Sequence, residues 1–136
     1  MFRIKYCREI VLKILYQVDV LDMWDGERSE RSQLTDDYLK SFRRVNAEEE
    51  SFVNRMLETV FELQPEMDRQ ISSHLKGWKL NRLSPVDRNL LRLGMAESRF
   101  NNQKAVVIDD VVRMAKKYGD EESFRFINAI LDKVIG

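Results

Sequence analysis

Few residues in this sequence have the types and spacing that catalysis requires. Cysteine and histidine each occur once, as Cys7 and His74, and Cys7 belongs to the apolar pattern of a helix. A nucleophile with its base, or a cluster of metal ligands, needs more such side chains. Asp109 and Asp110 are adjacent, so on a helix their carboxylates point about 100° apart. No glycine-rich phosphate loop occurs, and we predict a protein that is not an enzyme and holds no cofactor or metal.

The N-terminal residues favour a different chemistry, the binding of unpaired nucleic acid. The apolar face of the first predicted helix is complete without Tyr16, which projects on the opposite side with Leu12 and Lys13. The first 17 residues contain one acid, Glu9, and four cations, namely Arg3, Lys5, Arg8 and Lys13. An aromatic ring can stack on an unpaired base while cationic groups hold the phosphates. The alternative is that this face packs against the rest of the protein.

A second group of candidate residues lies in the last third of the chain. Phe126 lies about 100° from the centre of the apolar stripe of its predicted helix, so its ring is available for stacking or for wedging between elements. Lys116 and Lys117 end the preceding helix, where cations also complement the helix dipole. Each of these residues therefore has a structural explanation beside the functional one.

The stretch WKLNRLSPVDRNLLRLG, residues 78–94, predicts an unusual helix. Ser84 and Pro85 suit the N-cap and first position, and the apolar residues that follow spread over most of the helix surface. We expect a core helix contacted from several sides. Arg88, Arg92 and Arg99 fall within about 40° of one another at its open edge. These arginines suit either a protein partner or salt bridges between helices.

The elements that must position these residues are helices, and we expect an all-α fold. Apolar residues recur at three- and four-residue spacing, most clearly from Lys5 to Leu21. Residues 22–33 lack this pattern and predict a loop. Pro65 is expected to end one helix and open the next, Gly77 to cap that one, and Gly119 to stop a later helix in a left-handed turn. Seven helices are expected: residues 5–21, 36–44, 47–64 and 65–77, one from residue 85 that includes Arg99, and then 105–118 and 122–135.

Length and composition predict a single domain made of two packed bundles. The 136 residues can bury a core without disulfides, and the position of Pro65 divides them into a three-helix half, roughly 1–63, and a four-helix half, roughly 64–136. The 23 Lys+Arg balance the 23 Asp+Glu, so an anion-binding surface must come from local arrangement. One cysteine excludes an internal disulfide, and no apolar run approaches the ~20 residues of a membrane helix. We therefore expect a cytoplasmic protein without a membrane partner.

Three segments carry a resemblance to a known family. WKLNRLSPVDRNLLRLGMAE, VIDDVVRMAKKYGDEESFRFINAILDKV and the N-terminal REIVLKILYQVDV resemble the NusB family, whose motifs include W-x-x-x-R-L-x-x-V-D/E-R and K-F-V-N-G-x-L-D-K. The similarity covers nearly the whole chain and is weak only through residues 22–64. Ile4 and Tyr6 stand where the family often has arginines, and Ala129 replaces its usual glycine.

The resemblance implies a bacterial transcription antitermination factor. Such proteins bind boxA RNA together with NusE, a small-subunit ribosomal protein, and act with other Nus factors to keep RNA polymerase processive on ribosomal RNA operons. The resemblance implies that Asp87, Arg88 and Arg92 meet NusE, and that Glu122, Ser123 and Phe126 lie at the surface. The expected RNA-binding residues are Arg3, Lys5, Arg8, Tyr16, Lys116, Lys117, Glu122, Ser123 and Phe126.

Two alternatives remain open from the sequence. In the first, the chain is a free-standing relative of the NusB-like RNA-binding domain found at the N-terminus of some RNA cytosine methyltransferases, and acts as an adaptor. An α-helical interaction module without RNA binding would instead use Tyr16 and Leu12 as dimer contacts.

Overall fold

Helix α1 (Ile4–Val20) buries the face that the sequence predicts. In the computed structural model, which describes residues 1–26, 28–41 and 44–135, its apolar residues at three- and four-residue spacing are inaccessible to solvent. They are Cys7, Ile10, Val11, Ile14, Leu15 and Val18. Leu12, expected on the outer face, is also buried, at 4% exposure. Leu12 therefore cannot form the dimer contact considered above, because the chain's own core already covers it.

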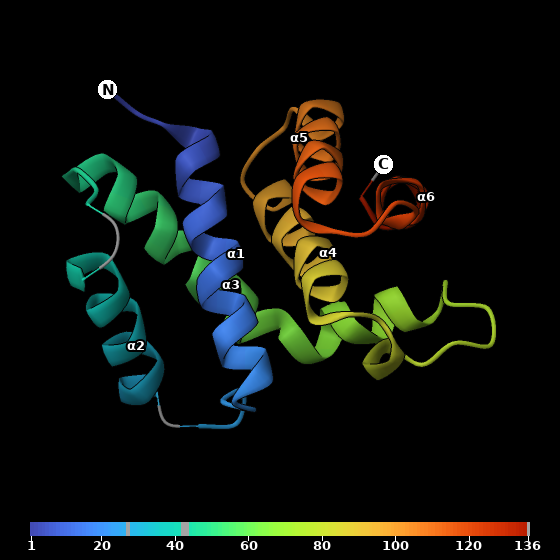
Figure 1. Ribbon diagram of the computed structural model, residues 1–136, viewed down its shortest axis with the longest axis horizontal. Helices are drawn as coiled ribbons and strands as arrows, with labels where there is room; N and C mark the ends of the chain where they lie inside the picture. The colour runs from blue at the N-terminus through green and yellow to red at the C-terminus, as the bar shows by residue number, and fades with distance from the viewer. Residues whose placement is uncertain (27, 42–43, 136) are drawn as a thin grey trace.

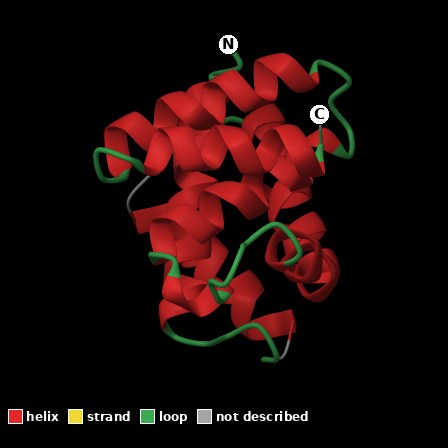
Figure 2. Ribbon diagram, turned by 90° about the vertical axis from the view of Figure 1, so that its right-hand side faces the viewer, coloured by secondary structure: helices red, strands yellow, loops and turns green. Residues whose placement is uncertain are grey.

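The all-helical prediction is confirmed over the described residues, which contain six α-helices, a short 3-10 helix and no strand (Figures 1 and 2). The elements after α1 are α2 (Arg28–Ser41), α3 (Ala47–Ser72), η1 (Leu80–Arg82), α4 (Pro85–Ser98), α5 (Lys104–Tyr118) and α6 (Ser123–Val134).

Helix α3 corrects the expectation that Pro65 separates two helices. The helix continues through Pro65 for 26 residues and spans the width of the molecule in Figure 1. Pro65 is exposed, while Val60 and Met67 on either side of it are fully buried. Packing of the apolar face offsets the hydrogen bond that proline cannot donate. The expected boundary between residues 63 and 64 therefore lies inside one helix that both halves of the chain share.

Helix α2 begins inside the stretch expected to be a loop, eight residues before the predicted start. Its sequence is mostly polar, and its buried side chains are Thr35 and Tyr38, so it lacks a strong apolar period. Tertiary contacts hold it instead. The Arg31 guanidinium donates to the backbone oxygens of Met23, Trp24 and Gly26, which fastens the first turns of α2 to the end of the preceding segment.

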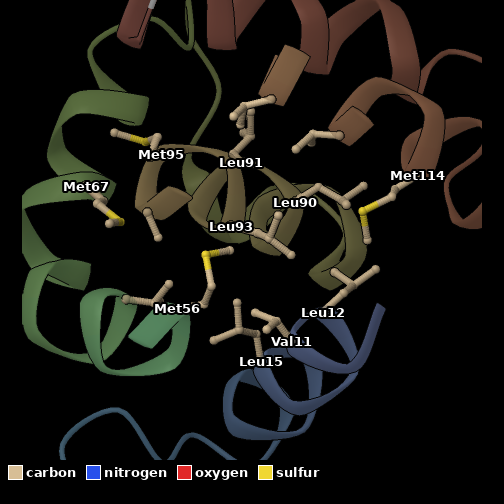
Figure 3. Packing of buried hydrophobic residues seen from close by; sticks show 14 of the residues in the cluster. Val11, Leu12, Leu15, Met56, Met67, Leu90, Leu91, Leu93, Met95 and Met114 are labelled. Carbon is tan, nitrogen blue, oxygen red and sulfur yellow. The ribbon is translucent and has the colours of Figure 1, made fainter. Parts of the chain in front are cut away.

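Helix α4 is the core helix that residues 78–94 predict. The Ser84 hydroxyl accepts a hydrogen bond from the Asp87 backbone N–H at 3.1 Å, and Pro85 occupies the first position, as expected. Residues from four helices surround α4, which contacts α1, α3, α5 and α6. Figure 3 shows Leu90, Leu91 and Leu93 of α4 among side chains contributed by its neighbours. Burial on nearly every side fixes α4 as the axis that positions the other helices.

Gly119 ends α5 as predicted but not in the predicted conformation. Its φ of −88° and ψ of −177° are extended, so the left-handed turn expected there is wrong. Space explains the glycine instead. A Cβ at this position would lie 2.6 Å from the Cβ of Ser123 and 2.8 Å from the backbone oxygen of Ala115.

Replacing Gly119 by alanine is therefore expected to lower the free energy of unfolding by about 1–3 kcal/mol, since the clash forces the backbone to shift. Urea denaturation measures the change. Gly26→Ala is the matched control, because its nearest neighbour is the flexible end of the Glu30 side chain. Equal stability of the two variants would contradict this account of Gly119.

Candidate nucleic-acid interface

Two grooves lie along α1, the first against α5 and the second where α1 meets residues of α2, α4 and the end of α5. The first is bordered by Lys5 and Glu9 of α1 and by Arg113 and Lys117 of α5. The second is more apolar and lies further along α1. Its lining residues are Leu12, Lys13, Tyr16, Gln17, Tyr38, Val86 and Tyr118. The Lys117 ammonium at the first groove lies 5.1 Å from the ring centroid of Tyr118 at the second, so the two grooves adjoin. We call their combined surface the α1/α5 face.

Tyr16 lies on the α1/α5 face with its side chain accessible, as the sequence predicts. It is 42% exposed, although the core surrounds the opposite side of α1. Tyr118 lines the same groove, and the ammonium groups of Lys13 and Lys117 lie 5.8 and 5.1 Å from its ring centroid. Aromatic rings and cations therefore share one surface, as stacking on bases and holding phosphates requires.

Sequence reasoning missed Arg113 and Tyr118 as members of this face and did not select Lys13 as a binding residue. Arg113 is 64% exposed on the α5 side of the first groove. The position of Tyr118, directly after Lys117 and before the glycine that ends the helix, could have marked it as a candidate binding residue. Periodicity along one helix could not reveal it, because its neighbours come from α1.

Lys117 and Glu9 join the two helices across the first groove. The Lys117 Nζ donates to Glu9 Oε1 at 2.8 Å, and the lysine side chain remains 62% exposed. Burial alone would raise the pKa of Glu9, but hydrogen bonds from Lys117 and Tyr118 lower it overall. The pKa of Lys117 is raised by its hydrogen bond to Glu9. Both groups are therefore charged at neutral pH. Lys116 is also exposed and lies over the Phe124 ring, 5.0 Å from its centroid.

Arg8 is not at the surface, which corrects its expected role as a phosphate contact. Its side chain is 2% exposed and donates through Nε and Nη2 to both oxygens of Glu97, at 2.7 and 2.6 Å. Its Nη1 donates to Asp110 Oδ2 at 2.6 Å. Burial opposes the charge of Arg8, yet the hydrogen bond to Glu97 leaves its pKa raised. Arg8 thus joins α1 to α4 and α5.

Arg3 ties the N-terminal segment to the start of α3. Its Nε and Nη2 donate to the two oxygens of Glu49, both at 2.8 Å, and its backbone N–H donates to the same carboxylate at 2.9 Å. Glu49 also completes the capping box of α3 with Asn46. The Arg3 side chain keeps 45% exposure, so its outer edge still faces solvent, as does Lys5.

The Glu49 contacts predict how stability depends on pH. Hydrogen bonds from the Arg3 side chain lower the pKa of Glu49 from 4.5 to about 2. A carboxylate with a lowered pKa contributes stability above its ordinary pKa and loses it as pH falls through the lowered value. The difference in unfolding free energy between wild type and Glu49→Gln should therefore be largest above a pH of about 4.5. It should shrink as the pH falls toward about 2.

Urea denaturation across this pH range measures the difference. Glu50→Gln removes one negative charge from the same helical turn and serves as the control. A difference between wild type and Glu49→Gln that stays constant with pH would contradict the assignment.

Residues of the α5–α6 turn divide between surface and interior. Glu122 is exposed and Phe126 is half-buried against the core. The expectation that Ser123 lies at the surface is wrong, since it is 3% exposed. Its Oγ donates to Asp87 Oδ2 at 3.0 Å and its backbone N–H donates to Asp120 Oδ1 at 3.1 Å. Ser123 holds this turn against the start of α4.

Asp87 is itself buried, at 9% exposure. Burial raises its pKa, and the nearby charge of Asp120 acts in the same direction, against the hydrogen bond from Ser123. Its Oδ1 is buried without a hydrogen-bond partner among the described residues. Asp87 therefore orients the α5–α6 turn and offers little surface to a partner.

The arginines of α4 form salt bridges inside the protein, as one of the two interpretations of the sequence had it. Arg88 donates through Nε and Nη2 to the carboxylate of Asp19, at 2.6 and 2.8 Å. Arg92 is 3% exposed and bridges Asp19 with Asp68 of α3. Burial would raise the pKa of Asp19, but the Arg88 hydrogen bonds and the charge of Arg92 lower it. Arg99, by contrast, is exposed.

The single cysteine, Cys7, is buried in the core. Burial raises the pKa of the Cys7 thiol to about 11, so the thiolate is scarce at neutral pH. The described residues contain no cluster of three or more side chains able to hold a metal ion. Among those residues, none of the helices has the length and apolar character needed to span a membrane.

The family of this chain follows from its similarity to known proteins. The profile of the NusB family matches residues 6–136. The chain belongs to the NusB family. A curated NusB relative, the transcription antitermination protein NusB of Syntrophomonas wolfei, is 36% identical over 131 residues, covering 95% of this chain and 92% of the relative.

Solved NusB structures have the same fold. NusB from T. maritima superposes with a TM-score of 0.85 at 32% identity, covering 99% of this chain and 92% of that one. A second structure, of the antitermination factors NusB and NusE in complex with dsRNA, gives a TM-score of 0.82 at 28% identity, covering 96% and 94%. This NusB chain therefore has the fold of relatives whose structures include RNA and NusE.

Proposed function

We propose that this NusB chain is a transcription antitermination factor that binds boxA-type single-stranded RNA together with NusE. In this role it acts in the cytoplasm with other Nus factors and keeps RNA polymerase processive on ribosomal RNA operons. The role is one of assembly and requires no catalytic residue. It agrees with the curated relatives, which are transcription antitermination proteins.

The observation that carries the proposal is the α1/α5 face. Tyr16 is exposed there, with Tyr118 in the same groove and the ammonium groups of Lys13 and Lys117 beside the Tyr118 ring. Lys5 and Arg113 add positive charge along the first groove, where Asp110 lies near Arg113 and Glu9 pairs with Lys117. A base can stack on an aromatic ring while its flanking phosphates pair with these cations. Arg8 and Ser123 serve this face indirectly, by fixing α1 and the α5–α6 turn.

We assign the NusE contact to the outer rim around the start of α4. Arg88 keeps 15% of its side chain exposed there while it pairs with Asp19. Asp87 and Arg92 are buried and hold α4 in position, so their contribution to NusE binding is indirect. Contact at this rim lies beside the α1/α5 face, because Val86 of α4 lines the groove that contains Tyr16.

The test is an anisotropy titration of labelled boxA RNA with this protein, with and without NusE, against a scrambled RNA. Linkage requires NusE and RNA to raise each other's affinity by the same factor. Affinity should also fall with salt, by roughly 0.7 log units per phosphate neutralised for each tenfold change. Equal binding of boxA and scrambled RNA under both conditions would overturn the boxA role, and no binding of either RNA would favour a helical interaction module.

A further inference from the structure

The segment between α3 and α4 concentrates positive charge in an otherwise neutral chain. No acidic residue occurs from residue 69 to residue 86, a stretch that contains four cations, namely Arg69, Lys76, Lys79 and Arg82. Within the described parts of the chain, no ion pair involves the last three. All three side chains are exposed. Their charge is therefore available to an external anion.

An exposed tryptophan stands among these cations. Trp78 is 63% exposed, more than any other described aromatic residue, and it lines a surface hollow with Gly77, Lys79 and Arg82. We call residues 76–82 the Trp78 loop. Among the other described aromatic side chains, only that of Tyr16 is largely exposed to solvent.

Leucines within and on either side of the loop anchor it to the core. Leu75 is buried, and Leu80 and Leu83 pack against the core. Gly77 has a φ of +76°, a conformation that favours glycine, and the Trp78 backbone N–H donates to the Leu75 backbone oxygen at 3.2 Å. Trp78 is therefore exposed because it lies in an ordered turn whose leucines, and not its tryptophan, pack into the core.

We propose that the Trp78 loop is a second single-stranded RNA contact, in which Trp78 stacks on an unpaired base and Lys76, Lys79 and Arg82 hold the flanking phosphates. This inference rests on the proposed function and extends it to a longer RNA. Stacking of a base requires only the face of the indole ring, and the phosphates of the same strand supply the negative charge that the cations bind. A protein partner would find little apolar surface here beyond Trp78, because the leucines face inward.

The position of the loop suits an RNA that also occupies the α1/α5 face. The loop leads directly into α4 through Ser84 and Pro85, and the next residue, Val86, lines the groove that contains Tyr16. In this proposal, nucleotides that extend beyond the boxA segment are the ones that reach the loop. Short RNA that covers only the α1/α5 face should not depend on Trp78, whereas RNA extended by unpaired nucleotides should.

Tryptophan fluorescence tests this directly, since the chain has two tryptophans. Trp24 is half-buried between the Arg92 guanidinium, 4.7 Å from its ring, and the Phe61 ring. In a Trp24→Phe variant, all tryptophan emission comes from Trp78. We expect boxA RNA extended at both ends by unpaired nucleotides to quench that emission, and short boxA RNA to leave it unchanged.

Affinity measurements with NusE present provide the second readout. Trp78→Ala should weaken binding of the extended RNA by about 5- to 150-fold, the range for loss of one stacked base. Trp78→Phe, which keeps an aromatic ring, should bind nearly as wild type. Lys79→Gln with Arg82→Gln should reduce the salt slope by about 0.7 for each cation lost. Lys104→Gln, at the exposed start of α5, is the charge control.

The outcomes separate this inference from the proposed function. Cooperative boxA binding with no change in Trp78 emission and no effect of Trp78→Ala would overturn the second contact and leave antitermination standing. Emission that responds to NusE alone and not to RNA would identify a protein contact and also overturn it. Quenching by extended RNA regardless of boxA sequence would support the loop contact even if boxA selectivity failed.

Discussion

Replacing Tyr16 by alanine is expected to weaken boxA binding by about 1–3 kcal/mol while leaving the free energy of unfolding nearly unchanged. The two effects separate because the ring is 42% exposed on the outer side of α1, whereas the core residues lie on the other side. Anisotropy titration with NusE present measures the first effect, and urea denaturation measures the second.

Two further variants sharpen the Tyr16 test. Tyr16→Phe keeps the ring and should retain most of the affinity. Val20→Ala removes another exposed apolar side chain from the same helix, 55% exposed, and should leave RNA binding unchanged. If Tyr16→Ala lost stability but no affinity, the ring would be a packing residue and the α1/α5 face would lose its stacking platform.

Replacing Arg8 by methionine should have the opposite pattern. We expect the free energy of unfolding to fall by about 3–5 kcal/mol, because the change leaves a buried carboxylate without its partner. Glu97 is fully buried and, among the described residues, its carboxylate would keep only the hydrogen bond from Asn101. Urea denaturation measures this loss. The salt dependence of RNA binding should stay unchanged, since Arg8 contacts no phosphate in this arrangement.

A double-mutant cycle distinguishes the pair from a general packing defect. Glu97→Gln together with Arg8→Met removes both charges and should recover part of the stability lost by Arg8→Met alone. Additive losses would contradict a direct Arg8–Glu97 interaction. If Arg8→Met kept its stability but its RNA affinity depended less on salt, Arg8 would be a phosphate contact after all.

Local patterns were sufficient to predict the helices that have a strong apolar period or a clear cap. Helix α1 follows its apolar spacing, and α4 begins where Ser84 and Pro85 indicate. The exposure of Tyr16 could likewise be predicted, because it depends on the angle between one residue and the apolar stripe of its own helix. Such features need information from only a few neighbouring residues.

Features that depend on distant partners could not be predicted in this way. The burial of Arg8 depends on Glu97, which is 89 residues away. Ser123 is buried where its hydroxyl donates to Asp87 of α4, and Arg31 of α2 donates hydrogen bonds to backbone oxygens of the preceding segment. The continuation of α3 through Pro65 depends on packing that outweighs a local preference. In each case a tertiary contact decides against the local signal.

The cluster around Asp19 has a consequence for the evolution of the family. One carboxylate on α1 accepts hydrogen bonds from Arg88, Asn89 and Arg92, and Arg92 in turn binds Asp68 on α3. A change at Asp19 alone removes the shared acceptor of three side chains at once, so we expect selection to oppose such a single change. These positions should therefore covary among homologues, with Asp19 lost mainly in lineages that have also replaced its arginines.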